Sequence, residues 1–340
     1  MAARILIVGN AAPGNLEASY DAAFRKLGCE VEVFSLAQAV DAHTRLGRAG
    51  RVFNRFVPVE PWVRKANREL IIKGIETEAQ AVVVIGAQDV RVGALAQLKV
   101  ATGASLALVW PDSLYAMADS MVACLRVFDV VGSFGREMVP VLAQLGARRA
   151  IWLPLAGDPE LHAVATVTAQ ECELYRADVT FIGGWRPERE KVLRALTDNH
   201  LKIWGPGWDR ECPDKDLVRR FWQGRALRGV EFAKAVAASK VNLNVIEMTN
   251  RSAANMRFFE VPMCGGLQWV SSCSEMAQEY RHGEHLFYFD EGVDMQSALC
   301  PILADDQLRA SVAAAGHRLT RERHTYEHRA RALLTELGIG

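Results

Sequence analysis

The chain has 340 residues, half of them hydrophobic, and its 40 Lys and Arg residues are balanced by 40 Asp and Glu residues. Chains longer than about 250 to 300 residues usually fold as more than one domain, so we expect two α/β domains. The balanced charge gives no general attraction to DNA or RNA, and we predict no nucleic-acid partner. Seven cysteines without a Cys-x-x-Cys pair argue against a disulfide framework and a structural zinc site.

The first residues run into a short apolar stretch without the core of a signal peptide. No apolar run approaches the roughly 18 residues needed to span a bilayer. These features predict a cytoplasmic protein.

Short β-branched runs alternate with helical patterns through the first part of the chain. The expected strands are Ile5–Val8, Val31–Phe34, Ala81–Ile85, Leu106–Val109, Val130–Gly132 and Ala150–Leu153. Near-continuous apolar strands separated by helices are typical of a parallel sheet covered on both faces. Residues 1–157 are therefore predicted to form a Rossmann-like domain.

The loop Gly9–Asn15 follows the first expected strand and opens onto a helix. Backbone N–H groups at such a helix start favour an anion such as phosphate, and Gly14 is our candidate contact there. The spacing is not Gly-x-Gly-x-x-Gly, and no acidic residue ends the second strand. A dinucleotide-dependent dehydrogenase is therefore disfavoured.

Residues 41–73 form the strongest shift in composition. They carry eight Lys or Arg against three acidic residues, a local charge of about +5. Interleaved apolar residues such as Phe53, Phe56 and Trp62 make the segment amphipathic. It can rest on anionic lipid or hold an acidic or lipid-linked acceptor, so peripheral membrane association stays open; it can equally be a solvated helix face that covers the sheet.

The stretch Pro154–Pro159 has the composition of a linker, and the alternating pattern resumes after it. The expected strands are Val179–Gly183, Leu201–Trp204, Val241–Val245, Leu267–Val270 and Leu286–Phe289. Residues 158–325 are predicted to form a second parallel-sheet domain that faces the first across a cleft. Two helices follow, at Gln307–Thr320 and Tyr326–Leu337, and we expect the last, in residues 326–340, to pack on the first domain.

Two glycine-rich loops follow strands of this second domain. Gly183 and Gly184 precede a helix that begins near Pro187, so their backbone can approach a pyrophosphate that Arg186 or Arg189 neutralises. The alternative is a tight turn with solvated arginines. The run Trp204–Trp208 places glycines beside two indoles on which a nucleobase can stack, although such tryptophans often only cover a core.

The run Asn255–Gly266 is the most informative part of the chain. Arg257 and Glu260 stand three residues apart, on one face of a short helix that ends at Gly265 and Gly266. Such a helix can present charge at the edge of a parallel sheet where α/β folds bind ligands. The alternative is that Glu260 merely caps a surface helix.

Six motifs together resemble one known family. They are Phe181-Ile182-Gly183-Gly184, Trp204-Gly205-Pro206-Gly207-Trp208, Lys240-Val241-Asn242-Leu243-Asn244, Arg257-Phe258-Phe259-Glu260, Cys264-Gly265-Gly266 and His324-Thr325-Tyr326. Their order and spacing resemble those of the CgeB-like, group 1 glycosyltransferases, and the resemblance covers nearly the whole chain. It implies the GT-B fold, in which two Rossmann-like domains face a cleft and the C-terminal one holds a nucleotide-sugar.

The resemblance also implies roles for individual residues. Glu260 would bond the ribose hydroxyls, and Arg257 would lie near the diphosphate together with the Gly183-Gly184 loop and Arg189. Backbone near Gly207 and along Gly224–Leu227 would line the base, with Trp208, Arg225 and Leu227 as candidate contacts. The donor would be a nucleoside-diphosphate sugar such as a UDP-, GDP- or dTDP-sugar, and no cofactor is expected.

One departure from the family concerns catalysis. Many retaining members carry a second glutamate eight residues before the ribose-binding one, and this chain has Ser252 there. The stereochemistry therefore stays open. An inverting enzyme needs a base for the acceptor hydroxyl, and Asp112 and then Asp89 are our candidates, since both follow expected strands. Either aspartate can instead be a helix N-cap.

We predict no metal site. His324 and His328 have the spacing of a helical pair, but no Glu follows the first as in His-Glu-x-x-His. The acidic residues Asp290, Glu291 and Asp294 fall in loops or helix starts, and the GT-B scheme needs no divalent ion.

The sequence therefore predicts a metal-independent glycosyltransferase of hexosyltransferase type. Its acceptor can be a glycan, a lipid-linked molecule, a protein or a small molecule. Two alternatives remain open: a nucleotide-sugar epimerase or hydrolase of the same fold, and a sugar-nucleotide-binding protein without turnover.

Overall fold

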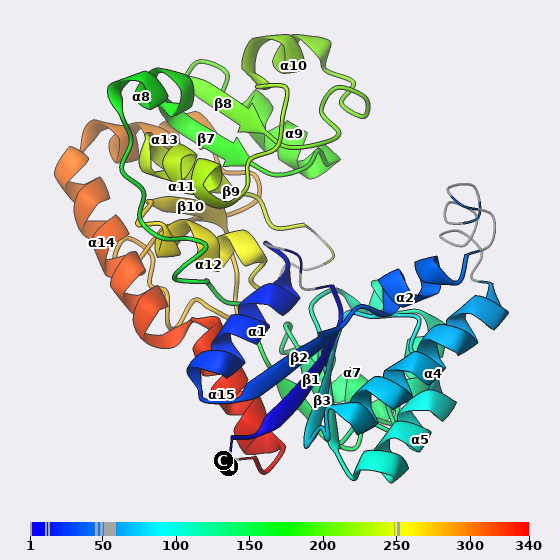
Figure 1. Ribbon diagram of the computed structural model, residues 1–340. Helices are drawn as coiled ribbons and strands as arrows, with labels where there is room; N and C mark the ends of the chain where they lie inside the picture. The colour runs from blue at the N-terminus through cyan, green and yellow to red at the C-terminus, as the bar shows by residue number, and fades with distance from the viewer. Residues whose placement is uncertain are drawn as a thin grey trace. The chain divides into compact units, whose positions relative to one another are not determined.

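The computed structural model describes residues 2–10, 12, 14–44, 47, 50, 59–247, 249 and 252–339. Much of the basic segment 41–73, including Phe53 and Phe56, lies outside these residues. Along the chain the described residues divide into two compact units, Met1–Pro154 with Tyr326–Gly340, and Leu155–Thr325. Each unit is built on one parallel β-sheet with helices packed against it (Figure 1).

The first unit contains a six-stranded sheet in the order β2-β1-β3-β4-β5-β6. Its strands are β1 Arg4–Val8, β2 Glu30–Phe34, β3 Ala81–Ile85, β4 Ser105–Trp110, β5 Val130–Ser133 and β6 Ala150–Trp152. Its helices are α1 Leu16–Lys26, α2 Leu36–Ala42, α4 Glu60–Glu76, α5 Val92–Thr102, α6 Asp119–Cys124, α7 Met138–Gln144 and α15 Tyr326–Glu336, with a 3₁₀ turn η1 at Leu114–Ala116. Central strands such as β3 are buried on both faces, as the apolar runs predict.

Helix α15 joins the first unit although it ends the chain, and it lies beside α1 (Figure 1). Tyr326 packs on Tyr20 with 5.3 Å between ring centroids. The Arg329 Nε–H donates to the Pro154 carbonyl at 2.8 Å, and Glu336 pairs with Arg149 at 2.5 Å. Aromatic packing and two charged bonds therefore fix this helix.

The second unit contains a five-stranded sheet in the order β11-β10-β9-β7-β8. Its strands are β7 Ala177–Ile182, β8 Leu201–Trp204, β9 Ser239–Asn244, β10 Gln268–Ser271 and β11 Phe287–Phe289. Its helices are α8 Ala169–Tyr175, α9 Pro187–Arg194, α10 Lys215–Phe221, α11 Gly229–Ala237, α12 Met256–Met263, α13 Met295–Ala304 and α14 Asp306–Arg323.

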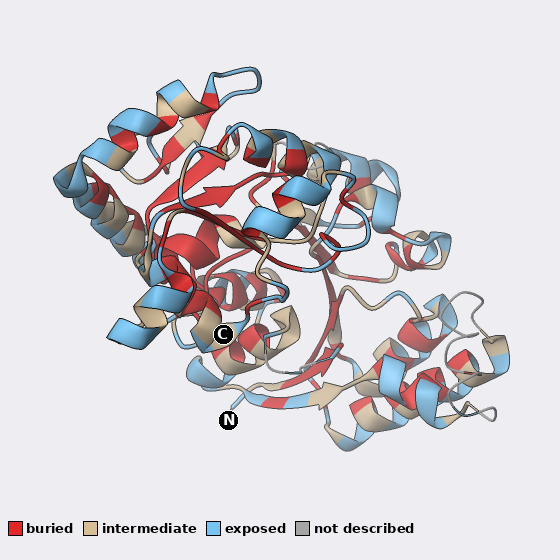
Figure 2. Cartoon of the chain, turned by 90° about the horizontal axis from the view of Figure 1, so that it is seen from above, coloured by how far each residue is buried: buried red, intermediate tan, exposed pale blue. Residues whose placement is uncertain are grey.

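Two apolar layers cover the faces of this second sheet, and most strand residues are buried between them (Figure 2). Alternate residues of β7 divide between the layers, because side chains along a strand alternate in direction. Phe181 joins the layer that contains residues of α9, α10, α13 and α14. Ile182 joins the layer that contains residues of α8, α11 and α12.

The predicted fold class is confirmed: both sheets are parallel and lie in α/β units. Each predicted strand is present, with ends that differ by at most two residues. The two helices predicted near the C-terminus correspond to α14 and α15. No helix in the described part of the chain is both long enough and apolar enough to cross a membrane.

Gly316 in α14 offers a test of packing in the second unit. A Cβ atom built there would lie 2.3 Å from the backbone carbonyl oxygen of His285, which cannot easily move. We expect Gly316→Ala to lower the free energy of unfolding by about 1 to 3 kcal/mol, measured by urea denaturation. Gly93→Ala is the control, because a Cβ at Gly93 meets no atom within 4 Å and helical Ala is favoured over Gly. Equal losses in the two variants would contradict this account of the α14 contact.

Candidate functional site

Two glycine loops meet at the carboxyl edge of the second sheet. Gly183 follows β7 and donates its N–H to the Trp204 carbonyl at 2.8 Å, and the Trp185 N–H donates to Pro206 at 3.0 Å. Gly205 has a φ of +141°, and a Cβ there would lie 2.0 Å from the Gly183 carbonyl oxygen. Only glycine at 205 therefore allows the two backbones to approach this closely.

The indoles beside these loops support them from within the core. Trp208 donates its Nε1–H to the Gly183 carbonyl at 3.0 Å, and Trp222 donates to Gly205 at 2.9 Å. Trp204 and Trp208 are at most 1% exposed. The expectation that a nucleobase stacks on them is therefore wrong, because burial leaves neither ring a face for a ligand.

A third backbone segment joins the same edge. Gly224 has a φ of +77°, and the carbonyl of Arg225 accepts the Gly205 N–H at 3.0 Å. The Arg225 guanidinium bonds Glu231 at 2.6 Å, while Leu227 is buried. The stretch 224–227 thus lies next to the loop that contains Gly207.

Arg189 on α9 is held against the first glycine loop. Its Nη1 donates to the Gly184 carbonyl at 2.8 Å, and its Nη2 donates to Glu247 at 3.1 Å. Its Nε is buried and has no hydrogen-bond partner among the described residues. Burial lowers the pKa of Arg189 from its usual value. Arg189 nevertheless stays charged, and its Nε–H remains available as a donor beside the Gly183-Gly184 loop.

Glu247 is a site residue that the sequence did not reveal as one. It accepts from Arg189 and lies 3.4 Å from the Arg186 Nε. Nothing in its local sequence indicates that Glu247 would contact Arg186 and Arg189, which lie about 60 residues earlier in the chain at α9.

Helix α12 is anchored by buried amides. The Asn255 side chain caps it by accepting the Phe258 N–H at 3.1 Å, and Asn255 exchanges two bonds of 2.9 Å with Asn244 at the end of β9. Asn244 also donates to Gln268 on β10. This network joins the helix start to the ends of two strands.

Arg257 extends from this helix toward the first glycine loop. Its Nε–H donates to the Ile182 carbonyl at 3.0 Å, and its guanidinium lies 4.5 Å from the Phe232 ring centroid. It is also bonded to Glu260. Burial lowers the pKa of Arg257 to about 10, which leaves it charged at neutral pH.

Glu260 is only 3% exposed. One carboxylate oxygen bonds Arg257, and the other lies 3.6 Å from Nε2 of His162. The alternative that Glu260 caps a surface helix is therefore wrong. His162 was not predicted, because a lone histidine after a linker gives no sequence signal of a partner on a distant helix.

The other predicted residues belong to the first unit. Gly14 adopts a φ of +86° in the turn before α1, where the Glu17 carboxylate already accepts the Asn10 N–H at 2.9 Å. Asp112 is exposed after β4 and accepts the Ser113 N–H at 2.7 Å. Asp89 is partly exposed, and its backbone carbonyl accepts from Asn67.

No group of three or more His, Cys, Asp or Glu side chains within the described ranges is arranged to hold a metal ion. His324 is buried and lies 2.8 Å from Glu279. The acidic cluster has ordinary structural contacts: Asp290 bonds Ser272, and Asp294 caps α13.

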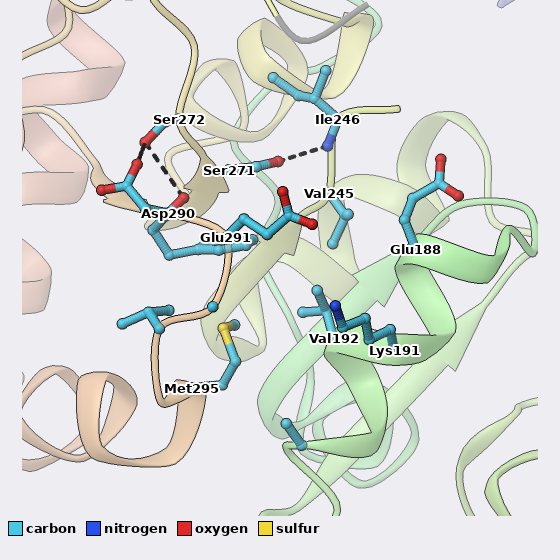
Figure 3. Close-up of a pocket in the computed structure, with 14 residues that line it drawn as sticks. Glu188, Lys191, Val192, Val245, Ile246, Ser271, Ser272, Asp290, Glu291 and Met295 are labelled. Atoms are coloured by element: carbon cyan, nitrogen blue, oxygen red, sulfur yellow. Dashed lines mark hydrogen bonds between the residues drawn. The ribbon is translucent and has the colours of Figure 1, made fainter. Parts of the chain in front are cut away.

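A cavity of about 300 Å³ lies beside α9 in the second unit, apart from the arginines described above. Figure 3 shows it between α9 and the ends of β9, β10 and β11. Buried Val245, Phe289 and Met295 line it, with exposed Lys191 and Glu291 at its edge. Neither Arg189 nor Glu260 contributes to it.

Comparison with solved structures defines the architecture. A glycosyltransferase from Rickettsia africae superposes with a TM-score of 0.69 at 10% identity, covering 99% of this chain and 98% of that one. Anabaena HepE in complex with UDP-glucose gives 0.66 at 11% identity, covering 98% and 99%. Sucrose-phosphate synthase from Thermosynechococcus elongatus gives 0.67 at 13% identity, covering 97% of each chain.

The chain has the GT-B fold of glycosyltransferases. Residues 186–335 also match the glycosyl transferase-like family. A search of curated proteins gave no match. The matched residues include α9, which supplies Arg189 in this GT-B chain. They also include α12, which supplies Arg257 and Glu260.

The cap of α12 gives a stability prediction for the site. Asn255→Ala removes the cap and leaves the Asn244 oxygen without its donor, so we expect a loss of about 2 to 4 kcal/mol in unfolding free energy. Asp294→Ala is the matched control, because it removes an exposed cap from α13 and should cost only about 1 kcal/mol. Urea denaturation measures both. An Asn255→Ala loss no larger than that of the control would show that the buried amide network contributes little.

Proposed function

We propose that this protein is a glycosyltransferase that transfers a sugar from a nucleoside-diphosphate donor to an acceptor. One observation carries the proposal: two partly buried arginines from different helices bond carbonyls at the end of β7 and in the glycine loop that follows it. Arg257 bonds Ile182, and Arg189 bonds Gly184. Their guanidinium groups therefore flank the Gly183-Gly184 backbone, where a diphosphate would be held.

The chemistry follows from charge. When the glycosidic bond to the diphosphate breaks, negative charge develops on the leaving oxygen, and fixed cations stabilise it without reorganisation. The Nε–H of Arg189, which has no partner in the described part of the chain, is available for this purpose. We further propose that Glu260 accepts from the ribose hydroxyls and that backbone at Gly207 and 224–227 contacts the base. The scheme requires no cofactor or metal ion.

Finer assignments belong to the same proposal. The six motifs favour a CgeB-like hexosyltransferase. UDP is the first nucleotide to test, since HepE was solved both with UDP-glucose and with UDP and glucose. For an inverting reaction Asp112 and then Asp89 remain the candidate bases. The acceptor is unidentified, and an anionic or lipid-linked acceptor at residues 41–73 is one candidate, although much of that segment lies outside the described residues.

The decisive experiment is a thermal-shift panel with UDP, GDP, dTDP, ADP and CMP, with NAD and S-adenosylmethionine as controls. A ligand at 100 times its dissociation constant adds about 2.7 kcal/mol of stability. We expect a selective shift with one nucleoside diphosphate. A shift only with NAD or S-adenosylmethionine would refute the proposal. Product analysis with the matching sugar nucleotide, with and without acceptors, then separates transfer from epimerisation or hydrolysis.

Arg189 provides the sharpest test of the diphosphate site. We expect Arg189→Gln to weaken nucleoside-diphosphate binding about 10- to 100-fold, because charge-assisted hydrogen bonds contribute about 1.5 to 3 kcal/mol. Binding of the nucleoside without phosphates should change little. Isothermal titration calorimetry measures both ligands.

Lys191→Gln is the matched control for that experiment. Lys191 is two residues along the same helix, carries the same charge and lines the separate cavity. Its replacement should leave diphosphate affinity unchanged. Equal effects at positions 189 and 191 would mean that only the overall charge of α9 matters.

A further inference from the structure

We propose that His162 is a positioning residue for nucleotide recognition, which holds the Glu260 carboxylate in the orientation that receives the ribose hydroxyls. This inference rests on the proposed function and deepens it. No sequence motif pointed to His162. Its assignment comes from the contacts of the imidazole ring.

The backbone around His162 determines where its proton lies. The Asp158 N–H points at Nδ1 of His162 at 3.3 Å, so Nδ1 is the acceptor. In a neutral imidazole the proton then resides on Nε2, which faces Glu260 at 3.6 Å. Burial holds the pKa of His162 at about 4, so the ring is neutral at physiological pH. His162 thus presents an N–H dipole to Glu260 rather than a second positive charge.

The ring itself is rigidly placed. His162 is 5% exposed, and its backbone N–H donates to the Asp158 carbonyl at 2.8 Å. The Asp158 side chain accepts from the backbones of Glu160 and Leu161 and so fixes the turn. The His162 ring also meets Phe232 edge-on at 5.8 Å, and Phe232 carries the Arg257 guanidinium on its ring. One phenyl ring therefore aligns both partners of Glu260.

Glu260 needs such a partner because its terminal torsion is soft. Rotation of a carboxylate about its last bond is broad and roughly two-fold. Arg257 holds one oxygen, and an N–H dipole facing the other removes the remaining freedom. Each oxygen has two lone-pair directions, so both keep capacity for a ribose hydroxyl. Without His162 the carboxylate would keep its bond to Arg257 but lose its fixed orientation.

The test compares UDP with 2′-deoxy-UDP, because correct placement of Glu260 should appear as preference for the 2′-hydroxyl. We expect the wild-type protein to bind UDP more tightly than 2′-deoxy-UDP. His162→Phe should reduce the ratio of the two affinities by about 3- to 10-fold, the effect of losing the hydrogen bond from the 2′-hydroxyl to Glu260. Glu260→Gln should reduce the ratio as well. The exposed His200 provides the control, and His200→Phe should leave the ratio unchanged. Titration calorimetry gives both affinities.

A second pair of variants separates positioning from folding. The amide nitrogen of Gln can reach the place of Nε2, whereas that of Asn reaches only the place of Nδ1. His162→Gln should keep the ratio and His162→Asn should lose it, and this comparison also applies if His162→Phe does not fold. An equal loss of both affinities, or an unchanged ratio in His162→Phe and His162→Asn, overturns the inference alone. Wild-type protein that binds none of the nucleoside diphosphates in the thermal-shift panel overturns the proposed function and this inference together.

Discussion

The ion pair between the buried carboxylate of Glu260 and the partly exposed guanidinium of Arg257 is the constraint on which the site depends. Removing a carboxylate from water is costly, and it persists only when it is paired and the remaining donors and acceptors of the pair are also satisfied. Arg257 meets this requirement through Ile182 and Phe232, and Glu260 through its contact with His162. The pair therefore ties α12 to β7, α11 and the turn after residue 157. A shift of α12 would keep the two charges paired, because both lie on this helix, but it would separate Arg257 from the Ile182 carbonyl and Glu260 from His162.

The same logic explains why α12 begins where it does. Its first turn is anchored by Asn255, whose amide joins the end of β9 through Asn244. Neutral amides at the sheet edge fix the helix without adding another buried charge. The pair can then lie one turn along the helix, close enough to the glycine loop for Arg257 to reach the Ile182 carbonyl.

Charge balance also defines what the site can accept. Arg257 is already paired with Glu260, and Arg189 is paired with Glu247, which Arg186 also approaches. An incoming diphosphate must therefore share these arginines with carboxylates. Arginine permits this, because its five N–H donors lie in a planar fork and can serve two anions at once. The buried Nε of Arg189 is a donor that Glu247 does not use.

The strands, their parallel arrangement and the glycine loops were predictable, because each depends on residues close together in the chain. Apolar runs identified the strands, and Gly265 ended α12 as expected. The contacts of His162, Glu247 and Trp208 were not predictable in this way. Each joins segments distant in sequence, and only packing decides whether an indole faces a ligand or supports a loop from within. The sequence thus indicated which loops form the site but not which side chains hold them in place. For Glu260 that difference is decisive, since a buried carboxylate with a defined partner at each oxygen can discriminate between ligands in a way that an exposed helix-capping glutamate cannot.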